Sequence, residues 1–333
     1  MNELLPQMMQ MIGAKLVTKP LYLAAKLGVA DLLAEGPCHV DDLATRTETH
    51  PPSLYRVLRA LASVGVFAEG PERHFANTPM SQMILSGPGS MRAMVLWLND
   101  PRHDQVWEHA LHSVKTGETG LADMGVQEIW PWLTSQRDLH EIFNNAMSSN
   151  ASNLHAAAAT AYDFSGIEHL MDVGGGHGAL MMRILAENPK LRGTVYDLPE
   201  VVVGARAELE TNHFAGRCAA VGGSFFESVP AADAHIMSFI LHDWSDEKAI
   251  TILRNIHKAQ PAHGKVLLVE MVVPPGNEPS FAKLLDMEML IMAGGRERTE
   301  AEFAAIFDAA GYRLSRIVPT PSPTSIIEAV KVG

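Results

Sequence analysis

The spacing of apolar residues changes near residue 166. Before that point, apolar residues recur at helical spacing in LYLAAKLGVADLL (21–33), VDDLATRT (40–47) and PPSLYRVLRALASVGVF (51–67). The last segment places proline where the first helical turn tolerates it. Two short apolar pieces around a turn, GVFAEG and RHFANT, come next. Helices followed by a small hairpin predict a mainly helical winged-helix domain over residues 1–90.

Residues 91–165 also look helical, and the sequence from 143 to 164 predicts a long helix that runs into the next domain. TGETG at 116–120 is the clearest loop, and we expect residues 91–165 to be a helical linker that supplies pocket helices.

From 166 to 333, short apolar runs alternate with amphipathic helices. The predicted strands include HLMDV, GTVYD, RCAAV, AHIMSFIL and KVLLVEMVV. A capping box at Thr299 and Glu302 predicts the start of a late helix, and the chain ends in two strands that we expect to pair antiparallel. This alternation predicts an α/β domain with a doubly wound, Rossmann-like parallel sheet and helices on both faces.

Charge bears on the winged-helix prediction, because that motif often binds DNA. The 333-residue chain has a formal net charge of −12, and residues 1–100 hold 8 Lys and Arg against 9 Asp and Glu. A DNA-binding face needs a basic excess, so we expect no nucleic-acid partner, and the acidic balance also argues against an anionic membrane surface. The first 30 residues carry more apolar surface than one small domain hides, which favours packing against a second copy.

Cysteine content and hydropathy indicate the compartment. Cys38 and Cys218 are far apart and fit no metal-ligand spacing, so we expect neither a disulfide framework nor a metal. The start MNELLPQMMQMIGAK lacks a signal-peptide pattern, and no window of about 18 residues is uninterruptedly apolar. We therefore expect a soluble, cytoplasmic protein.

The strongest local signal is the glycine loop in MDVGGGHGALM, residues 171–181. Glycines between a strand and a helix let the backbone turn sharply and approach a ligand closely. Gly174, Gly176 and Ala179 satisfy the loose dinucleotide pattern, so NAD is one option. Asp172 beside the loop favours S-adenosylmethionine (SAM), because a carboxylate suits its ammonium group and opposes a pyrophosphate. A purely structural turn is the third interpretation.

The next predicted strand ends at Asp197, about 20 residues beyond the loop. A carboxylate there accepts hydrogen bonds from ribose hydroxyls, which fits NAD and SAM equally. The alternative is that Asp197 only caps the following helix.

The stretch HIMSFILHDWSDE, residues 235–247, delivers an imidazole to the end of an apolar strand. In an open parallel sheet, ligands bind at the carboxyl ends of the strands, so we expect His242 there, with Glu270 and Glu297 close by. An imidazole braced by carboxylates is a suitable general base. The alternative interpretations are that His242 is a hydrogen-bonded structural residue and that Glu297 forms a surface ion pair with its flanking arginines.

Two further interpretations concern the residues that follow His242. Asp243, Ser245, Asp246 and Glu247 could cap the next helix and complement its dipole. A divalent metal on His242, Asp243 and Asp246 has no further ligand spacing to support it.

In order and spacing, DVGGGHG, YDLP, GGSFFESVP, LHDWSDE, LLVE and GGRERT resemble the SAM-dependent small-molecule O-methyltransferases of the plant caffeate and hydroxyindole type, in their bacterial branch. KLGVADLL, SLYRVLRALASVGVF and FANT resemble that family's N-terminal winged-helix dimerisation domain. The resemblance covers nearly the whole chain. It implies a class I methyltransferase domain, an intertwined homodimer, and methylation of a hydroxyl on a small aromatic molecule, with S-adenosylhomocysteine (SAH) as product.

The resemblance also assigns site residues. It implies His242 as catalytic base, with Glu270 and Glu297 as flanking carboxylates. The implied cofactor contacts are Asp172, Gly174, Gly176, Asp197, Leu198, Gly223, Ser224, Phe225 and Ser238. The implied acceptor-pocket residues are Asn99, Phe143, Met147, Phe239, Asp243 and Met289.

Two positions depart from the family pattern. Ser224 replaces an Asp found in many relatives, and Ser238 replaces a Lys four residues before the His. A hydroxyl binds more weakly than a charged group. These changes leave a second hypothesis open, a non-methylating decarboxylase, hydroxylase or pericyclase on the same fold. A non-enzymatic DNA-binding regulator is a third, which the charge count disfavours.

Overall fold

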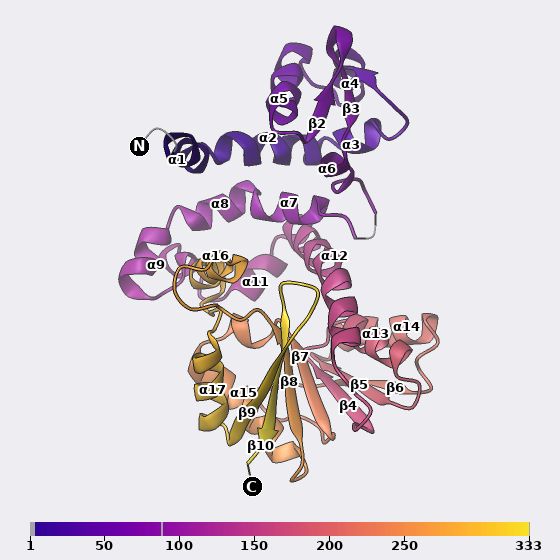
Figure 1. The fold of residues 1–333 in the computed structure, drawn as a ribbon, viewed down its shortest axis with the longest axis vertical. Helices are drawn as coiled ribbons and strands as arrows, with labels where there is room; N and C mark the ends of the chain where they lie inside the picture. The colour runs from indigo at the N-terminus through magenta and orange to yellow at the C-terminus, as the bar shows by residue number, and fades with distance from the viewer. Residues whose placement is uncertain (1–3, 88, 333) are drawn as a thin grey trace. The chain divides into compact units, whose positions relative to one another are not determined.

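The computed structural model describes residues 4–87 and 89–332, with the backbone alone at 150–153. The chain forms two compact units, which we describe separately (Figure 1). Unit 1 comprises Met1–Gln105 and Trp130–Asn150, and unit 2 comprises Val106–Ile129 and Ala151–Gly333. The first three residues of the N-terminal stretch examined for a signal peptide lie outside the described residues.

Unit 1 begins with the winged-helix pattern that the sequence predicts. Its first elements are α1 (Leu4–Ile12), α2 (Lys15–Lys26), α3 (Val29–Leu32), β1 (Cys38–His39), α4 (Val40–Arg46), α5 (Pro51–Ser63), β2 (Phe67–Glu69), a 3₁₀ turn (Pro71–Arg73) and β3 (His74–Asn77). Strands β2 and β3 form the antiparallel hairpin, and the two-residue β1, which the sequence did not reveal, completes a sheet of order β1-β3-β2.

Two predicted helices of this region are shorter than their patterns suggest. The segment 21–33 is divided at Gly28, which adopts a left-handed conformation with φ of 67°. The segment 51–67 is helical only to Ser63, because Gly65 turns the chain with φ of 82° into β2. Glycine reaches this conformation without the steric cost that a Cβ atom imposes.

Helices complete unit 1, and two more begin unit 2. They are α6 (Pro79–Gln82), α7 (Arg92–Leu98), α8 (Pro101–Trp107), α9 (Ala110–Thr116), α10 (Gly120–Asp123), α11 (Ile129–Thr134) and α12 (Arg137–Ala161). The predicted loop at 116–120 separates α9 from α10. The long helix predicted at 143–164 is α12, which begins six residues earlier, at Arg137.

The N-terminal helix α1 contributes nothing to the core of unit 1. That core is built from α2 to α5, β2 and β3 and includes Val40, Leu58, Leu61 and Phe75. No residue of α1 is buried, and its apolar side chains are exposed, for example Met11 at 73% and Ile12 at 71%. An uncovered apolar helix of this kind needs a partner surface in water.

Unit 2 contains a seven-stranded sheet of order β6-β5-β4-β7-β8-β10-β9. The strands are β4 (His169–Val173), β5 (Arg192–Asp197), β6 (Cys218–Gly222), β7 (Ala234–Ser238), β8 (Lys265–Glu270), β9 (Tyr312–Pro319) and β10 (Ser325–Lys331). The first five are parallel, and β10 runs antiparallel to both β8 and β9. The predicted parallel sheet and the predicted C-terminal antiparallel pair are both confirmed.

Helices cover both faces of this sheet (Figure 1). One core contains the C-terminal part of α12 with α13 (Ala179–Glu187) and α14 (Val201–Thr211). The other contains α15 (Asp246–Ala259) and α17 (Glu300–Ala309), which begins with the predicted Thr299–Glu302 capping box. Helix α16 (Phe281–Glu288) continues into a π-helical turn, Met289–Ala293.

The strand order reverses between β4 and β7, because the chain proceeds from β4 to β5 and β6 on one side and returns to β7 on the other. Ligands of doubly wound sheets bind in the crevice outside such a reversal. The glycine loop follows β4 and the His242 segment follows β7, so both lie at this switch point.

The prediction that the strand continues to His242 is wrong. Strand β7 ends at Ser238, and His242 lies in a 3₁₀ turn, Leu241–Asp243. Phe239 breaks the strand with φ of 52°, a left-handed conformation that a bulky residue rarely adopts. The residues after Ser238 are still apolar because the turn they form is buried. A run of apolar residues in the sequence therefore does not distinguish a buried strand from a buried turn.

Within the described residues, no helix is both long enough and apolar enough to cross a membrane.

His235 in β7 makes the stability of unit 2 sensitive to acid. Its imidazole is fully buried, with one ring nitrogen 3.1 Å from the Pro230 carbonyl oxygen and the other 2.9 Å from the Gln260 amide nitrogen. Burial lowers the pKa of His235 to about 4. The unfolded chain protonates near its ordinary value of about 6.5, so the unfolded state binds more protons between the two values.

We expect the free energy of unfolding to fall by up to about 3 kcal/mol as pH decreases from 6.5 to 4 on account of this histidine. Denaturant titrations across this range measure the effect. His235→Gln should reduce the slope of stability against pH, whereas the same substitution at the exposed His263 should not. Equal slopes in wild type and His235→Gln would contradict the assignment.

Candidate active site

The glycine loop is shaped by close packing against the segment that follows β7. Gly174, Gly176 and Gly178 all have left-handed φ angles, of 70°, 55° and 83°. A Cβ atom on Gly174 would lie 2.5 Å from Cδ1 of Ile240, whereas Gly176 faces open space. The loop therefore needs glycine at 174 for both its backbone angle and its packing.

Two aspartates flank this loop in different environments. Asp172, at the end of β4, is 1% exposed, and its Oδ2 has no hydrogen-bond partner among the described residues. Burial and the nearby charge of Asp197 raise the pKa of Asp172 to about 7. Asp197, at the end of β5, accepts hydrogen bonds from the backbone N–H groups of Gly176 (2.8 Å) and Leu198 (2.7 Å).

The capping alternative for Asp197 is not what the structure shows. Its carboxylate reaches back to the glycine loop and to the adjacent residue, rather than to the first turn of α14, which begins at Val201. Asp197 therefore joins the ends of β4 and β5 into one edge.

The remaining predicted cofactor residues continue along this edge. Gly223 comes directly after β6 and packs against Tyr196 of β5. A Cβ atom at this position would lie 2.3 Å from the Tyr196 hydroxyl oxygen. The Ser224 hydroxyl accepts a hydrogen bond from the Phe226 N–H (3.3 Å), and Phe225 packs edge-on against Phe226 and Trp244. Ser238 ends β7, so all nine predicted positions lie at or just beyond the carboxyl ends of four adjacent strands.

The His242 imidazole is held by a buried carboxylate. Its Nδ1 lies 2.7 Å from Oε1 of Glu297, and the residues are 8% and 3% exposed. The short contact fixes the ring, because Nδ1–H donates to the carboxylate. Nε2 then remains as the nitrogen that can accept a proton.

Two more carboxyl groups surround this pair. Asp243 Oδ1 lies 3.5 Å from His242 Nε2. Glu270, at the end of β8, uses Oε1 to accept a hydrogen bond from the Leu241 N–H (2.8 Å), and thereby fixes the turn that carries His242. Oε2 of Glu270 and Oε2 of Glu297 are buried without a partner among the described residues.

The electrostatics of the cluster favour a proton on His242. Burial alone would lower the pKa of His242, but the charges of Asp243, Glu297 and Glu270 outweigh it and raise the value to about 9. Burial and the charge of Glu297 raise the pKa of Glu270 to about 7, although His242 and Arg298 act in the opposite direction. The free protein therefore stores a proton in this cluster at neutral pH.

The surface ion-pair alternative for Glu297 is wrong. Arg298 is fully buried and donates to the carbonyl oxygens of Leu241 and Trp244 (both 2.9 Å) and to Asp246. Arg296 pairs with Asp246 and Glu302. Because both arginines bind other groups, the ion-pair partner of Glu297 is His242.

The structure confirms the capping interpretation for three of the four residues after His242 to which it was applied. Ser245 is the N-cap of α15, so Asp243 is not the helix cap, while Asp246 and Glu247 do fall in the first turn. Asp246 forms ion pairs with Arg296 and Arg298. Within the chain segments that the structure describes, no group of three or more His, Cys, Asp or Glu side chains is arranged to hold a metal ion.

The predicted acceptor residues are divided between the units. In unit 2, the Phe239 ring centroid lies 5.1 Å from that of His242, and the buried Met289 begins the π-helical turn. In unit 1, Phe143 packs edge-on against Trp97 and Trp130.

Two other acceptor predictions also fall in unit 1. Met147 is 37% exposed, and the Asn99 side chain donates to the Val95 carbonyl oxygen of its own helix. The role of the three unit 1 residues in a pocket stays a prediction.

Sequence reasoning missed two residues of this region. Arg298 looked like one of two surface arginines, and only its burial shows that it holds the 241–246 segment. His155 in α12 lies beside Ser238, with Nε2 3.3 Å from its hydroxyl oxygen, and no sequence signal separates it from other helix residues.

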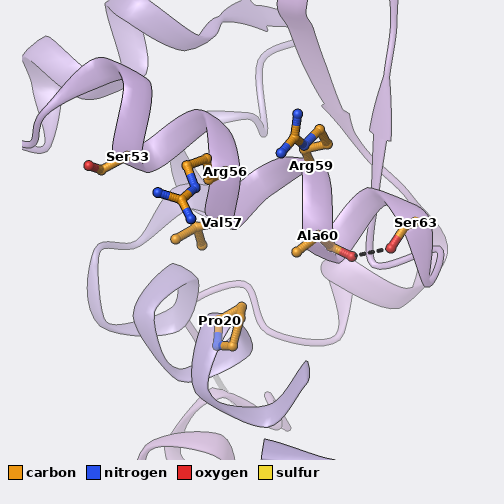
Figure 2. Close-up of a pocket in the computed structure, with 7 residues that line it drawn as sticks. All are labelled: Pro20, Ser53, Arg56, Val57, Arg59, Ala60 and Ser63. Atoms are coloured by element: carbon orange, nitrogen blue, oxygen red, sulfur yellow. Dashed lines mark hydrogen bonds between the residues drawn. The ribbon is translucent and has the colours of Figure 1, made fainter. Parts of the chain in front are cut away.

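A hollow of about 530 Å³ lies elsewhere, in unit 1 (Figure 2). It is lined by Pro20 of α2 and by six residues of α5, namely Ser53, Arg56, Val57, Arg59, Ala60 and Ser63. Its lining contains no carboxylate and no histidine, so it offers no acid–base pair.

A doubly wound sheet whose switch point carries a glycine loop with two aspartates and a buried histidine is typical of a Rossmann-like class I methyltransferase. Residues 107–313 match the family model for the O-methyltransferase domain, and residues 9–87 match the O-methyltransferase dimerisation domain. The chain belongs to this family of SAM-dependent O-methyltransferases. The dimerisation-domain match and the exposed α1 together support a homodimer.

Known proteins resemble the chain over nearly its whole length. The phenazine O-methyltransferase PhzM of Lysobacter antibioticus is 42% identical, across 97% of this chain and 95% of its own. The aclacinomycin 10-hydroxylase RdmB of Streptomyces purpurascens is 33% identical, across 97% and 89%. The crystal structure of human N-acetylserotonin methyltransferase in complex with SAM superimposes with a TM-score of 0.88 at 26% identity, covering 98% of this chain and 97% of that one.

The packing of Gly174 against Ile240 predicts a graded loss of stability. Gly176→Ala should cost about 1–2 kcal/mol, because alanine is forced into a left-handed conformation without a collision. Gly174→Ala should cost about 1–3 kcal/mol more, because its methyl group also overpacks the site.

Denaturant unfolding of both variants measures the difference. Ile240→Val removes the colliding Cδ1, so in a double-mutant cycle it should recover part of the additional loss at Gly174 and none at Gly176. Purely additive effects at Gly174 and Ile240 would disprove the packing argument.

Proposed function

We propose that this enzyme transfers the SAM methyl group to a hydroxyl of a small aromatic secondary metabolite, and that His242 is the general base. The observation that carries the proposal is the buried 2.7 Å contact between His242 and Glu297 at the switch point of the sheet. The identity to a phenazine O-methyltransferase supports an aromatic acceptor.

The edge of the sheet fits the donor. The buried Oδ2 of Asp172 has no hydrogen-bond partner among the described residues, and an ammonium group of the donor would supply one. Gly174 has no side chain, so its backbone can approach the donor closely. The Asp197 carboxylate suits ribose hydroxyls, and Gly223, Ser224 and Phe225 are placed to border an adenine ring. When bound, SAM supplies an electrophilic methyl group on a positively charged sulfur.

His242 and its neighbours have separate tasks in this mechanism. Glu297 orients the imidazole through Nδ1, so that Nε2 removes the proton from the acceptor hydroxyl as the oxygen attacks the methyl group. Glu270 fixes the backbone of the turn, and Asp243 lies on the Nε2 side. Most of the acceleration comes from holding the acceptor oxygen in line with the methyl group.

A raised pKa opposes the role of His242 as a base, because only the neutral imidazole accepts a proton. A base that reaches the acceptor oxygen lies within about 5–8 Å of the donor sulfur, since one hydrogen bond and one reacting contact separate them. The positive charge of the sulfur therefore disfavours a second positive charge on His242. A bound sulfonium would lower the pKa of His242 and so favour the neutral imidazole, and the carboxyl groups of Asp243, Glu297 and Glu270 would stabilise the imidazolium once His242 has taken the proton.

Three of the positions assigned to the acceptor belong to unit 2: Phe239 and Met289 are apolar, and the charged Asp243 lies on the Nε2 side of His242. A flat aromatic ring packs well against phenylalanine and against methionine, whose thioether adapts to irregular shapes. Hydroxylated phenazines, quinones and simple phenols are the acceptors to assay first.

Removal of the base should reduce turnover with little effect on donor affinity. We expect His242→Ala to lower kcat by about 100-fold or more, because general-base catalysis contributes at least this much. Transfer of a labelled methyl group measures turnover, and calorimetry with SAH measures donor affinity. His263→Ala, at an exposed histidine, is the control. Undiminished turnover in His242→Ala would remove this residue from the role of base.

The pH profile should follow the proton on His242. In the free enzyme, kcat/KM for the donor should rise with pH, reach half its maximum near pH 9 and level off above that value, because the raised pKa keeps the base protonated at lower pH. The rise in kcat should come at lower pH, since the bound sulfonium disfavours that proton. Glu297→Gln should move the rise in kcat/KM to lower pH, whereas Glu300→Gln, at an exposed carboxylate of α17, should leave it in place. A profile that Glu297→Gln does not shift would contradict the coupling.

A non-methylating reaction on the same fold is the second candidate, and one observation favours it. The relative RdmB, 33% identical to this chain, is a 10-hydroxylase, and Ser224 and Ser238 depart from the donor-binding pattern. Donor carrying a labelled methyl group separates the two candidates. Label in the product supports methyl transfer, and a changed product without label supports the second candidate.

A further inference from the structure

His155 is a histidine near the glycine loop, and neither of its ring nitrogens makes a strong hydrogen bond among the described residues. It lies in α12, three residues before Ala158, which belongs to the same buried core as α13. Its Nε2 is 3.3 Å from the Ser238 hydroxyl oxygen, which is long for such a bond, and its buried Nδ1 has no partner among the described residues. Because Nε2 makes only this weak contact, its N–H can donate to a stronger acceptor when a ligand binds.

The surroundings keep this ring neutral in the free protein. Burial lowers the pKa of His155 to about 4, and the positive charge of Arg183 in α13 acts in the same direction. No hydrogen bond or ion pair engages the Arg183 guanidinium within the described part of the chain. A positive charge and two donors that lack strong partners make this corner attractive to an anion.

The position of Ser238 connects this corner to the donor site. Strand β7 pairs with β4 so that Ile236 is opposite Asp172, which places Ser238 level with Gly174 two residues further along. Gly174 in turn packs against Ile240. His155 and Ser238 therefore border the glycine loop on the side where β4 and β7 diverge.

The donor carries a group for which the predicted cofactor residues provide no cation. Its amino-acid part has one ammonium and one carboxylate, and both charged residues among the nine predicted positions, Asp172 and Asp197, are acidic. They suit the ammonium and the ribose. The carboxylate therefore needs donors from outside that set.

We propose that the His155 Nε2–H and the Ser238 hydroxyl form a two-donor site for the carboxylate of the methyl donor, with Arg183 supplying nearby positive charge. Each of the two groups donates to one carboxylate oxygen, in place of the weak hydrogen bond that they share in the free protein. The site compensates for the lysine that many family members have at position 238. This inference rests on the proposed function only in taking SAM as the donor.

Calorimetry with two ligands tests the site without turnover. SAH carries the carboxylate, and its decarboxylated analogue, 5′-(3-aminopropylthio)-5′-deoxyadenosine, retains the adenosine, sulfur and ammonium. We expect His155→Leu to weaken SAH binding by about 10- to 100-fold, the usual range for hydrogen bonds to a charged group, and to leave binding of the analogue unchanged. Ser238→Ala should show the same selectivity.

Two variants sharpen the result. Ser238→Lys in the His155→Leu background should restore much of the affinity for SAH, because an ammonium replaces the lost donors. His169→Leu is the matched control, since His169 makes a similar 2.9 Å contact with the Thr194 hydroxyl at the opposite, amino end of the sheet. It should not change the ratio of the two affinities.

Each outcome has a separate meaning. Equal losses for both ligands in His155→Leu would show that the histidine is only structural, and the inference would fail while the proposed function stands. Unchanged binding of both ligands would also overturn it. A wild-type protein that binds neither SAH nor SAM would instead refute the proposed function.

Discussion

The buried contact between His242 and Glu297 is the interaction on which the rest of the site depends. A carboxylate with an almost inaccessible side chain is costly unless it is paired, and the imidazole is its partner. The two residues are 55 positions apart, so the contact forms only when the turn after β7 and the loop before α17 have both docked. Three carboxyl groups around one imidazole then make a region that favours cations.

Much of the surrounding polar structure serves to hold that turn. Glu270 accepts the Leu241 N–H from one side, and the buried Arg298 donates to the Leu241 and Trp244 carbonyl groups from another. The strained backbone of Phe239 lets the chain leave β7 abruptly and brings its ring against His242. Strain of this kind persists only where neighbouring contacts over-determine the conformation, as they do here.

The positions of the glycine loop and of the turn that carries His242 share one architectural cause, the reversal of strand order between β4 and β7. The reversal opens the crevice where the glycine loop, Ser238 and the 3₁₀ turn meet. Ile240 lies against Gly174, so the glycine loop and the segment that leads into the His242 turn are in direct contact. A change in one is therefore transmitted to the other by packing alone.

The sequence by itself determined the elements whose signals are local. Alternating apolar runs predicted the parallel sheet, the Thr299 capping box predicted the start of α17, and the glycine pattern predicted the tight loop after β4, because each pattern is set by neighbours a few residues apart. It also identified the histidine and both glutamates, through motif order. Only the tertiary structure decided that β7 stops at Ser238, that Glu297 pairs with His242 rather than with its flanking arginines, and that His155 faces Ser238 across 83 positions. Those partnerships depend on which distant segments meet and how much water is excluded between them, and neither is encoded in the periodicity of a single stretch.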